Sequence, residues 1–240
     1  MNQSFLNIAA YKFVTLDELP ALRADLHGLC KSLALKGTIL LAPEGINLFL
    51  AGTEEAVKIF LRELRDKAPF HDIPEKRSIS ATQPFGRLLV KLKQEIIPLG
   101  RRDIDPARAP ARRLAPRDLK RWLDEGREVV LFDTRNTFEV EHGTFHGAQH
   151  IGLKNFRSFG IRVSELDPAL KEKTVVAFCT GGIRCEKAAP LMIQEGFRDV
   201  YQLDGGILKY FEECGSSHFD GNCYVFDERI ALDADLSSPE

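Results

Sequence analysis

The sequence lacks several features that would remove it from the class of ordinary globular proteins. No apolar run among its 240 residues approaches the roughly 18 residues needed to cross a bilayer. Residues 1–10 have neither the basic start nor the long apolar stretch of a secretory leader. The five cysteines form an odd set without regular short spacing, which argues against a disulfide framework. These absences predict a reduced, cytoplasmic protein with no membrane association.

The chain also lacks a strong charge of one sign. Its 33 basic and 35 acidic side chains leave a net charge of -2, so any nucleic-acid contact must rely on a local basic patch. No internal repeat or low-complexity tract is visible, and 44% hydrophobic residues are typical of a folded chain. Because 240 residues exceed the roughly 100 to 200 of one domain, we expect two compact domains.

The first part of the chain, residues 1–98, has the periodicity of a small α+β domain. Leucines recur at steps of three and four from Leu19 to Leu33, which predicts an amphipathic helix ended by Gly37. Pro43-Glu44-Gly45 predicts a hairpin turn, and Thr53 can cap a second helix. The expected strands cover residues 11–16, 38–42, 46–50, 79–82 and 87–92. This order predicts a βαββαβ domain of the ferredoxin or acylphosphatase type.

Residues 99–113 combine two prolines with five arginines, which predicts an exposed, basic connection. In residues 114–232, short apolar strands alternate with helices, a pattern typical of a parallel sheet covered on both faces. The expected strands lie at residues 129–132, 174–178 and 200–203, and the expected helices at residues 116–124, 186–195 and from 207 onward. We therefore predict a second, α/β domain, followed by a loose tail at residues 233–240.

A cysteine follows one of these expected strands at its carboxyl end, where the active groups of open parallel sheets gather. The loop is Cys179-Thr180-Gly181-Gly182-Ile183-Arg184. Its glycines can adopt conformations closed to other residues, so that successive N–H groups can point inward and bind an anion. The positive end of the following helix and the charge of Arg184 also favour a thiolate at Cys179. The loop therefore predicts that Cys179 is a nucleophile.

The alternative for Cys179 is a buried structural cysteine in front of a glycine-containing turn. A disulfide with Cys185 is disfavoured in the reducing cytoplasm, although Cys185 can serve as a resolving thiol. Cys30 lies next to the leucine stripe and is expected to be a packing residue. Cys214 and Cys223 show no recognisable pairing.

The loop, the Asp133-Thr134-Arg135 segment and the Gly205-Gly206 turn all resemble parts of a rhodanese domain. The cysteine of such a domain carries sulfur as a persulfide. The longer string at residues 179–187 resembles the bacterial tRNA uridine hydroxylase family, in which an acylphosphatase-like domain precedes a rhodanese-like α/β domain with a parallel sheet. The resemblance covers about residues 11–231. It includes the strings at residues 36–42, 44–47, 133–136, 143–145 and 205–210. Longer members of the family carry a cysteine-rich C-terminal extension that this sequence lacks.

The resemblance implies a tRNA-modifying enzyme that hydroxylates the wobble uridine (position 34) to 5-hydroxyuridine, with molecular oxygen as co-substrate. It implies that Cys179 is the catalytic cysteine, and the loop chemistry gives Arg184 and the loop amides the role of stabilising developing negative charge. Residues Asp133, Arg135, Asn136 and Cys185 are expected to support the loop. No metal or other cofactor motif is evident, tRNA rather than DNA is the expected partner, and the sequence carries no signal for an oligomeric state.

Two other functions use the same residues. A persulfide-forming sulfurtransferase would take sulfane sulfur on Cys179 and pass it to a thiol or to RNA. A non-catalytic docking module of the rhodanese fold predicts loss of the nucleophile, and Cys179 is retained.

Three further sets of residues have both a functional and a structural interpretation. Residues 91–127 carry 11 basic and 6 acidic side chains, so this stretch is either an RNA-binding patch or a solvated connection. Arg135 either braces a strand end through Asp133 or reaches a ligand, and we favour bracing. For Asn136 the sequence favours neither a structural nor a functional role. His142, His146 and His150 have the spacing of metal ligands on a helix, but the glycines between them favour a turn entering a strand. The patch residues expected to bind RNA are Arg101, Arg102, Arg112 and Arg113.

Overall fold

The computed structural model describes residues 4–101 and 103–238. The chain divides into two compact units. The first contains the chain up to Ile96 together with Asp227–Arg229, and the second contains Ile97–Phe226 and the segment after Arg229. None of the helices in the described residues has the length and apolar character needed to cross a bilayer.

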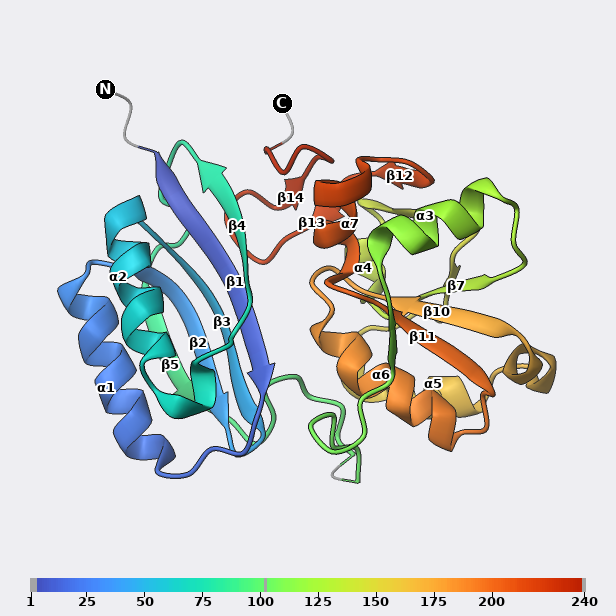
Figure 1. Ribbon diagram of the computed structural model, residues 1–240, viewed down its shortest axis with the longest axis horizontal. Helices are drawn as coiled ribbons and strands as arrows, with labels where there is room; N and C mark the ends of the chain where they lie inside the picture. Colours follow the sequence, from blue (N-terminus) through green and yellow to red (C-terminus); the bar gives the residue numbers. More distant parts are fainter. Residues whose placement is uncertain (1–3, 102, 239–240) are drawn as a thin grey trace. The chain divides into compact units, whose positions relative to one another are not determined.

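The first unit is a five-stranded sheet with the strand order β4-β1-β3-β2-β5. Strand β3 is antiparallel to both β1 and β2, and β4 is antiparallel to β1, which is the split βαβ arrangement that the sequence predicts. Helices α1 and α2 cover one face of this sheet (Figure 1). The elements are β1 (Phe5–Phe13), α1 (Leu19–Ser32), β2 (Lys36–Ala42), β3 (Gly45–Gly52), α2 (Glu54–Arg65), η1 (Ala68–Phe70), β4 (Glu75–Ser80) and β5 (Leu88–Leu92).

Local signals in this unit are largely confirmed. The Thr53 hydroxyl accepts a hydrogen bond from the Ala56 N–H at 3.3 Å and so caps α2. Cys30 is buried in the core between helices and sheet, as expected of a packing residue. The role given to Gly37 is wrong, because α1 ends at Ser32 and Gly37 lies within β2. A glycine is required at position 37 because φ there is +131° and a Cβ would lie 2.0 Å from the Phe49 carbonyl oxygen.

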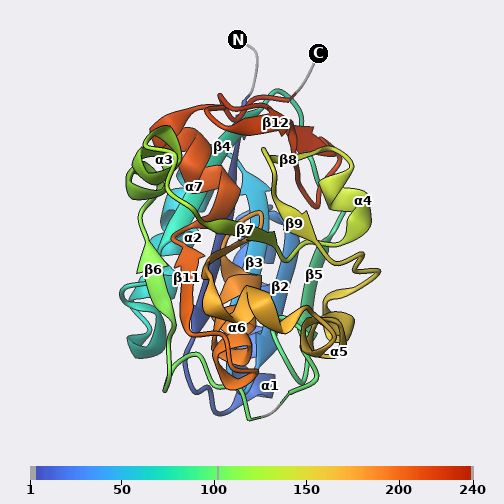
Figure 2. The same ribbon diagram turned by 90° about the vertical axis from the view of Figure 1, so that its right-hand side faces the viewer.

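The second unit contains a parallel sheet with the order β6-β11-β10-β7-β9. Helices α5 and α6 lie on one face and α3 and α7 on the other, as Figures 1 and 2 show. The expected parallel sheet covered on both faces is therefore confirmed. The main elements are β6 (Arg112–Leu114), α3 (Pro116–Asp124), β7 (Val130–Asp133), α4 (Thr137–Val140), β8 (Gly143–Phe145), β9 (Gln149–His150), α5 (Phe159–Ser164), β10 (Thr174–Phe178), α6 (Ile183–Gln194), β11 (Asp199–Leu203) and α7 (Gly206–Cys214).

Both ends of the second unit differ from the sequence expectation. Leu99, Ile104 and Ala111 are buried in its core and β6 begins at Arg112, so residues 99–113 are not an exposed connection throughout. Beyond α7 the chain forms three further short strands, β12 (Phe219–Gly221), β13 (Cys223–Tyr224) and β14 (Ala231–Leu232). In the segment expected to be a loose tail, Leu236 packs against the α3–α7 core. Two short 3-10 turns, η2 (Phe156–Ser158) and η3 (Pro168–Glu172), complete the unit.

Candidate active site

The reactive loop lies where β10 ends and α6 begins. Cys179 follows the last residue of β10, and Gly182, with a φ of +99°, is the N-cap of α6. This left-handed conformation, which favours glycine, turns the Gly182 N–H back toward the loop. The N–H donates to Cys179 Sγ at 3.2 Å. The inward-pointing amides inferred from the glycines are thus present around the sulfur.

The environment of Cys179 favours the thiolate, although the residue is fully buried. Burial alone would raise its pKa, but hydrogen bonding from the Cys185 thiol, the charge of Arg184 and the N–H groups of Arg184 and Gly182 outweigh it. Together they lower the pKa of Cys179 from 9.0 to about 5. The sulfur therefore has several donors beside it, within a buried hydrophobic cluster of which Cys179 is a member. Because it has no exposed surface, a substrate can reach it only after neighbouring groups move.

Cys185 lies on the first turn of α6 and is also fully buried. Burial raises its pKa well above its ordinary value, and hydrogen bonding and charge from ionised Cys179 raise it further. The Thr134 hydroxyl lies 3.6 Å from Cys185 Sγ. Of the two thiols, Cys179 is therefore the ionised one, and Cys185 is a neutral donor beside it.

Arg184 forms a buried ion pair that the sequence analysis missed. Its two terminal nitrogens donate to the two carboxylate oxygens of Glu139, each at 2.6 Å. Both side chains are almost completely buried, with 6% of Arg184 and 0% of Glu139 exposed. Such a bidentate pair fixes the guanidinium in one orientation. Burial opposes the charge of Arg184, but the bonds to Glu139 prevail and keep the pKa of Arg184 above its ordinary value.

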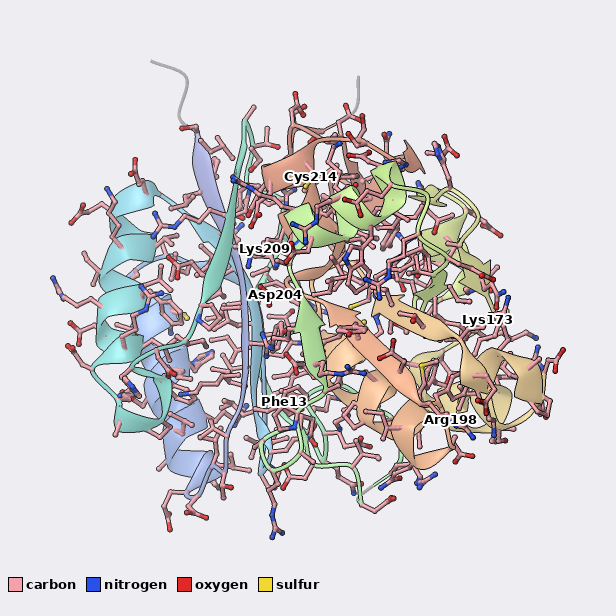
Figure 3. The ribbon with its side chains drawn as sticks, turned by 45° about the vertical axis from the view of Figure 1, so that its right-hand side comes forward. Phe13, Lys173, Arg198, Asp204, Lys209 and Cys214 are labelled. Atoms are coloured by element: carbon pink, nitrogen blue, oxygen red, sulfur yellow. The ribbon has the colours of Figure 1, made fainter. Side chains whose placement is uncertain are left out.

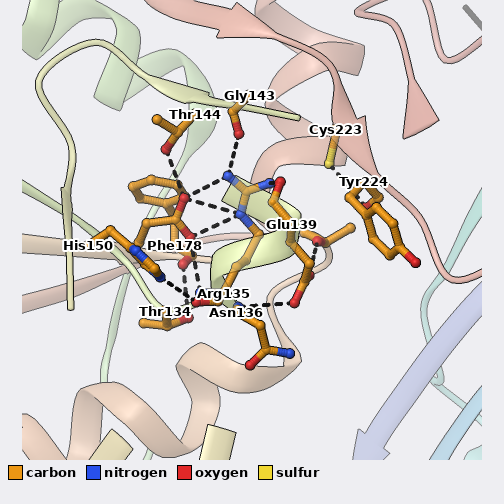
Figure 4. Close-up of polar contacts among 12 residues, drawn as sticks. Thr134, Arg135, Asn136, Glu139, Gly143, Thr144, His150, Phe178, Cys223 and Tyr224 are labelled. Atoms are coloured by element: carbon orange, nitrogen blue, oxygen red, sulfur yellow. Dashed lines mark hydrogen bonds and ion pairs between the residues drawn. The ribbon is translucent and has the colours of Figure 1, made fainter. Parts of the chain in front are cut away.

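Glu139 also connects α4 to the loop. Its carboxylate accepts the Asn136 N–H at 3.1 Å, in the manner of a helix N-terminal capping box (Figure 4). It also accepts the Thr180 hydroxyl at 3.4 Å. Asn136 is the N-cap residue of α4 and thereby helps to place Glu139. The spacing of Asn136 and Glu139 is the one sequence signal that points to this arrangement.

Asp133 and Arg135 form a second buried ion pair at the end of β7. Arg135 Nε lies 2.9 Å from one carboxylate oxygen of Asp133, and the Arg135 terminal nitrogen NH2 lies 2.6 Å from the other. NH2 also donates to the Gly143 carbonyl at 2.6 Å, and Thr144 donates to Asp133 at 2.8 Å (Figure 4). The guanidinium is committed to these contacts, so Arg135 braces the strand end. It has no exposed surface through which to meet a ligand.

The Gly205-Gly206 turn supports the loop from the neighbouring strand. Gly206 has a φ of +66°, and a Cβ there would lie 2.4 Å from the Cys179 carbonyl oxygen and 2.8 Å from the Gly182 nitrogen. The Ile207 N–H donates to that same carbonyl at 2.9 Å. The two glycine-containing segments quoted for the rhodanese resemblance are therefore packed directly against each other.

The remaining cysteines have different positions. Cys223, on β13, is fully buried, and its thiol donates to the Tyr224 carbonyl at 3.8 Å. The neighbouring Thr180 hydroxyl of the loop partly offsets the effect of burial on its pKa. Burial raises the pKa of Cys223 to about 12, so it is a neutral thiol. Sequence reasoning gave it no role, because no spacing connects it to residue 180. Cys214 is the last residue of α7 (Figure 3).

The three histidines do not converge. His146 is hydrogen-bonded with Asp220 at 2.7 Å, whereas the His150 ring contacts the Arg135 carbonyl at 3.0 Å. The His142 ring lies against Tyr224, with ring centroids 5.2 Å apart. Each therefore has its own neighbour in the fold.

Three of the four arginines expected to bind RNA form pairs with carboxylates. Arg101 forms hydrogen bonds to Asp103 at 2.8 and 2.7 Å. Arg112 pairs with Asp199 and lies over the Tyr201 ring, and Arg113 pairs with Glu186 at 2.6 Å and with Asp204 at 3.1 Å. Arg102 lies outside the described residues. Because these pairs reduce the charge available to phosphates, RNA binding by this patch stays a prediction.

Comparison with known proteins agrees with both halves of this architecture. Residues 5–96 match the model of a UPF0176 acylphosphatase-like domain, and residues 115–213 match a rhodanese-like domain. A Variovorax paradoxus protein named tRNA uridine(34) hydroxylase is 54% identical over 98% of this chain and 92% of its own length. A Bordetella petrii protein of the same name is 53% identical over 97% and 94%.

This chain belongs to the tRNA uridine(34) hydroxylase family. The fold class inferred from sequence is likewise confirmed, an acylphosphatase-like domain followed by a rhodanese-like domain. Among solved structures, a rhodanese-like domain from Anabaena is similar at 20% identity and a TM-score of 0.38, covering 45% of this chain and 78% of that one. A human single-domain sulfurtransferase is similar at 25% identity and a TM-score of 0.36, covering 44% and 97%.

Proposed function

We propose that this chain is a tRNA-modifying enzyme that hydroxylates carbon 5 of uridine 34 in the cytoplasm. The observation that carries the proposal is the ionised Cys179 held by loop amides and Arg184, in a chain whose near-full-length relatives are named for this reaction. Cys179 is the proposed catalytic residue. The loop amides and Arg184 hold the negative charge on its sulfur, and the neutral Cys185 thiol donates a hydrogen bond to it.

Molecular oxygen is the proposed co-substrate. One oxygen atom enters the C5–H bond and the other leaves as water, which consumes two electrons and two protons. Two thiols that are converted to one disulfide supply both, so a thiol is a suitable reductant for an assay in vitro. Isotopically heavy O2 should therefore place one heavy atom in the nucleoside. A product that takes its oxygen from water instead would contradict this part of the proposal.

Nucleoside mass spectrometry tests the function itself. A strain that lacks the gene is complemented with the wild-type chain, with Cys179→Ala, or with Cys214→Ala as a matched control. Wild type and Cys214→Ala are expected to restore 5-hydroxyuridine in tRNA, and Cys179→Ala is expected to restore none. Failure of the wild-type chain, or full modification by Cys179→Ala, would refute the proposal; the latter result would favour a docking role.

A persulfide-forming sulfurtransferase is the second candidate, because N–H donors around Sγ also suit the anionic outer sulfur of a persulfide. The test is transfer of sulfur from thiosulfate to cyanide by the purified chain. High turnover together with unmodified tRNA in the complemented strain would favour this candidate. Slow transfer together with restored 5-hydroxyuridine would favour the hydroxylase.

A further inference from the structure

The second unit carries a cluster of four aromatic rings that no part of the proposed chemistry uses. Phe138 lies 5.1 Å from Tyr224 and 6.4 Å from Phe226, and Tyr224 lies 5.2 Å from Phe226, measured between ring centroids. The three pairs are nearly perpendicular, at 82°, 90° and 82°. His142 completes the cluster beside Tyr224. We call these four residues the aromatic platform.

The platform is exposed where a core cluster would be buried. Phe138 retains 42% of its surface and Phe226 49%, and both belong to the small set of large apolar side chains that are exposed on this chain. His142 is exposed and Tyr224 is partly buried between its neighbours. Contact of adjacent aromatic side chains with water is unfavourable in free energy, so an exposed group of them commonly marks a binding surface. The exposed fractions of Phe138 and Phe226 leave aromatic surface that a planar ligand can contact.

The fold ties this platform to the reactive loop at two points. Phe138 precedes Glu139, which holds Arg184 and accepts from Thr180. Tyr224 follows Cys223, a buried thiol next to Thr180 of the loop, because the Thr180 hydroxyl partly offsets the rise that burial causes in the pKa of Cys223. Figure 4 shows Tyr224 and Cys223 beside Glu139. Helix α4 and strand β13 therefore carry the aromatic rings and the loop contacts in consecutive residues.

We propose that Phe138, Tyr224 and Phe226 form a stacking surface for unpaired nucleobases that flank the reacting uridine in an anticodon loop. This inference rests on the proposed function, because it takes base 34 to be the group that approaches Cys179. The bases attached to it then lie beside whatever surface borders the loop. Single-stranded bases in RNA loops are typically bound by stacking on Phe, Tyr and His rings, which suits this surface.

Stacking can be measured separately from catalysis. An anticodon stem-loop with 2-aminopurine at position 35 reports stacking by fluorescence quenching when it binds to the full chain. Phe138→Leu and Phe226→Leu keep an apolar side chain but remove the ring, whereas Phe138→Trp keeps a ring. Ile161→Ala, which removes an apolar side chain that is 66% exposed on α5, is the matched control.

Each leucine variant is expected to reduce quenching and to raise the Kd for the stem-loop about 5- to 150-fold, the range for loss of one base–aromatic stack. Phe138→Trp and Ile161→Ala should stay near wild type. The ultraviolet titration of Cys179 should be unchanged in all four variants, which separates lost stacking from a disturbed loop.

Wild-type quenching and Kd in both leucine variants would overturn the platform, even if the wild-type chain makes 5-hydroxyuridine; the surface would then fit a protein partner better. Conversely, a wild-type chain that makes no 5-hydroxyuridine refutes the proposed function. In that case the quenching data still decide whether the rings bind RNA bases.

Discussion

Replacement of Glu139 by glutamine tests whether the loop depends on a buried ion pair. The substitution keeps the shape of the side chain and one acceptor oxygen but removes the charge that faces Arg184 at two distances of 2.6 Å. Because 6% of Arg184 and 0% of Glu139 is exposed, the buried guanidinium loses the carboxylate bonded to it and keeps only the coulombic interactions with Cys179 and Asp133. Breaking a buried pair in this way costs about 3–5 kcal/mol, and we expect a loss near the lower limit because the amide oxygen still accepts one bond.

Urea unfolding followed by tryptophan fluorescence measures the loss of stability in the second unit, which contains Glu139 and Arg184. The chain has one tryptophan, Trp122 on α3, which therefore reports on the second unit. The matched control is Glu165→Gln, because Glu165 forms an exposed pair with Arg162 at 3.2 Å and its loss should change stability by less than about 1 kcal/mol.

A double-mutant cycle with Arg184→Met separates the pair from general disruption. Removing both charges should cost less than the sum of the single changes, because neither partner is then left as an unpaired charge. A loss below about 1 kcal/mol for Glu139→Gln, or strict additivity in the cycle, would refute the reasoning.

Four further predictions concern other parts of the site. The ultraviolet absorbance of the Cys179 thiolate, which is the part that disappears in Cys179→Ser, should titrate with a midpoint of about pH 5. Because the ordinary pKa is 9.0, the stability that the folded protein gains from this ionisation is complete above pH 9 and is lost as the pH falls to 5. Cys185→Ala should move this midpoint upward, because the sulfur loses a donor, and an unchanged midpoint would contradict that role. Gly206→Ala should displace the loop and reduce activity more than 10-fold, since a Cβ would lie 2.4 Å from the Cys179 carbonyl oxygen; wild-type activity and melting temperature would argue against this packing. Arg135→Lys should cost about 3 kcal/mol in urea unfolding, whereas the exposed Arg112→Lys should cost less than about 1 kcal/mol, and equal losses would show that burial is not decisive.

Local patterns predicted most of the fold because their causes are local. The leucine stripe and Thr53 placed α1 and α2, and the proline and glycine at residues 43–45 placed the hairpin between β2 and β3. Strand β1, in contrast, covers Phe5–Phe13 instead of residues 11–16, because its extent is set by pairing with β3 and β4. Gly37 was misread for the same reason: the close approach of Phe49 is a contact between strands and leaves no trace in the local sequence.

The candidate site divides in the same way. The position of Cys179, the glycines and the helix start were readable, since they follow one another in the chain. Glu139 was missed because it meets Arg184 across 45 residues of sequence, and the four-residue helix that carries it is too short to show a periodicity. Cys223 was missed because only the path of the chain after α7 brings it to Thr180. Charges and thiols distant in sequence are paired by topology, which composition and spacing do not encode.

The contacts of Arg184 change how its effect on the sulfur is understood. The sequence suggests that the charge of Arg184 favours the thiolate, and the structure shows that its terminal nitrogens are bonded to Glu139. Its backbone N–H, like that of Gly182, helps to lower the pKa of Cys179. The side chain therefore acts on the sulfur through its charge alone, while Glu139 fixes where that charge lies. Stability and thiolate formation are thus separate consequences of one residue. A buried anion that holds the loop arginine is accordingly as much a part of the reactive site as the glycines that supply the amides.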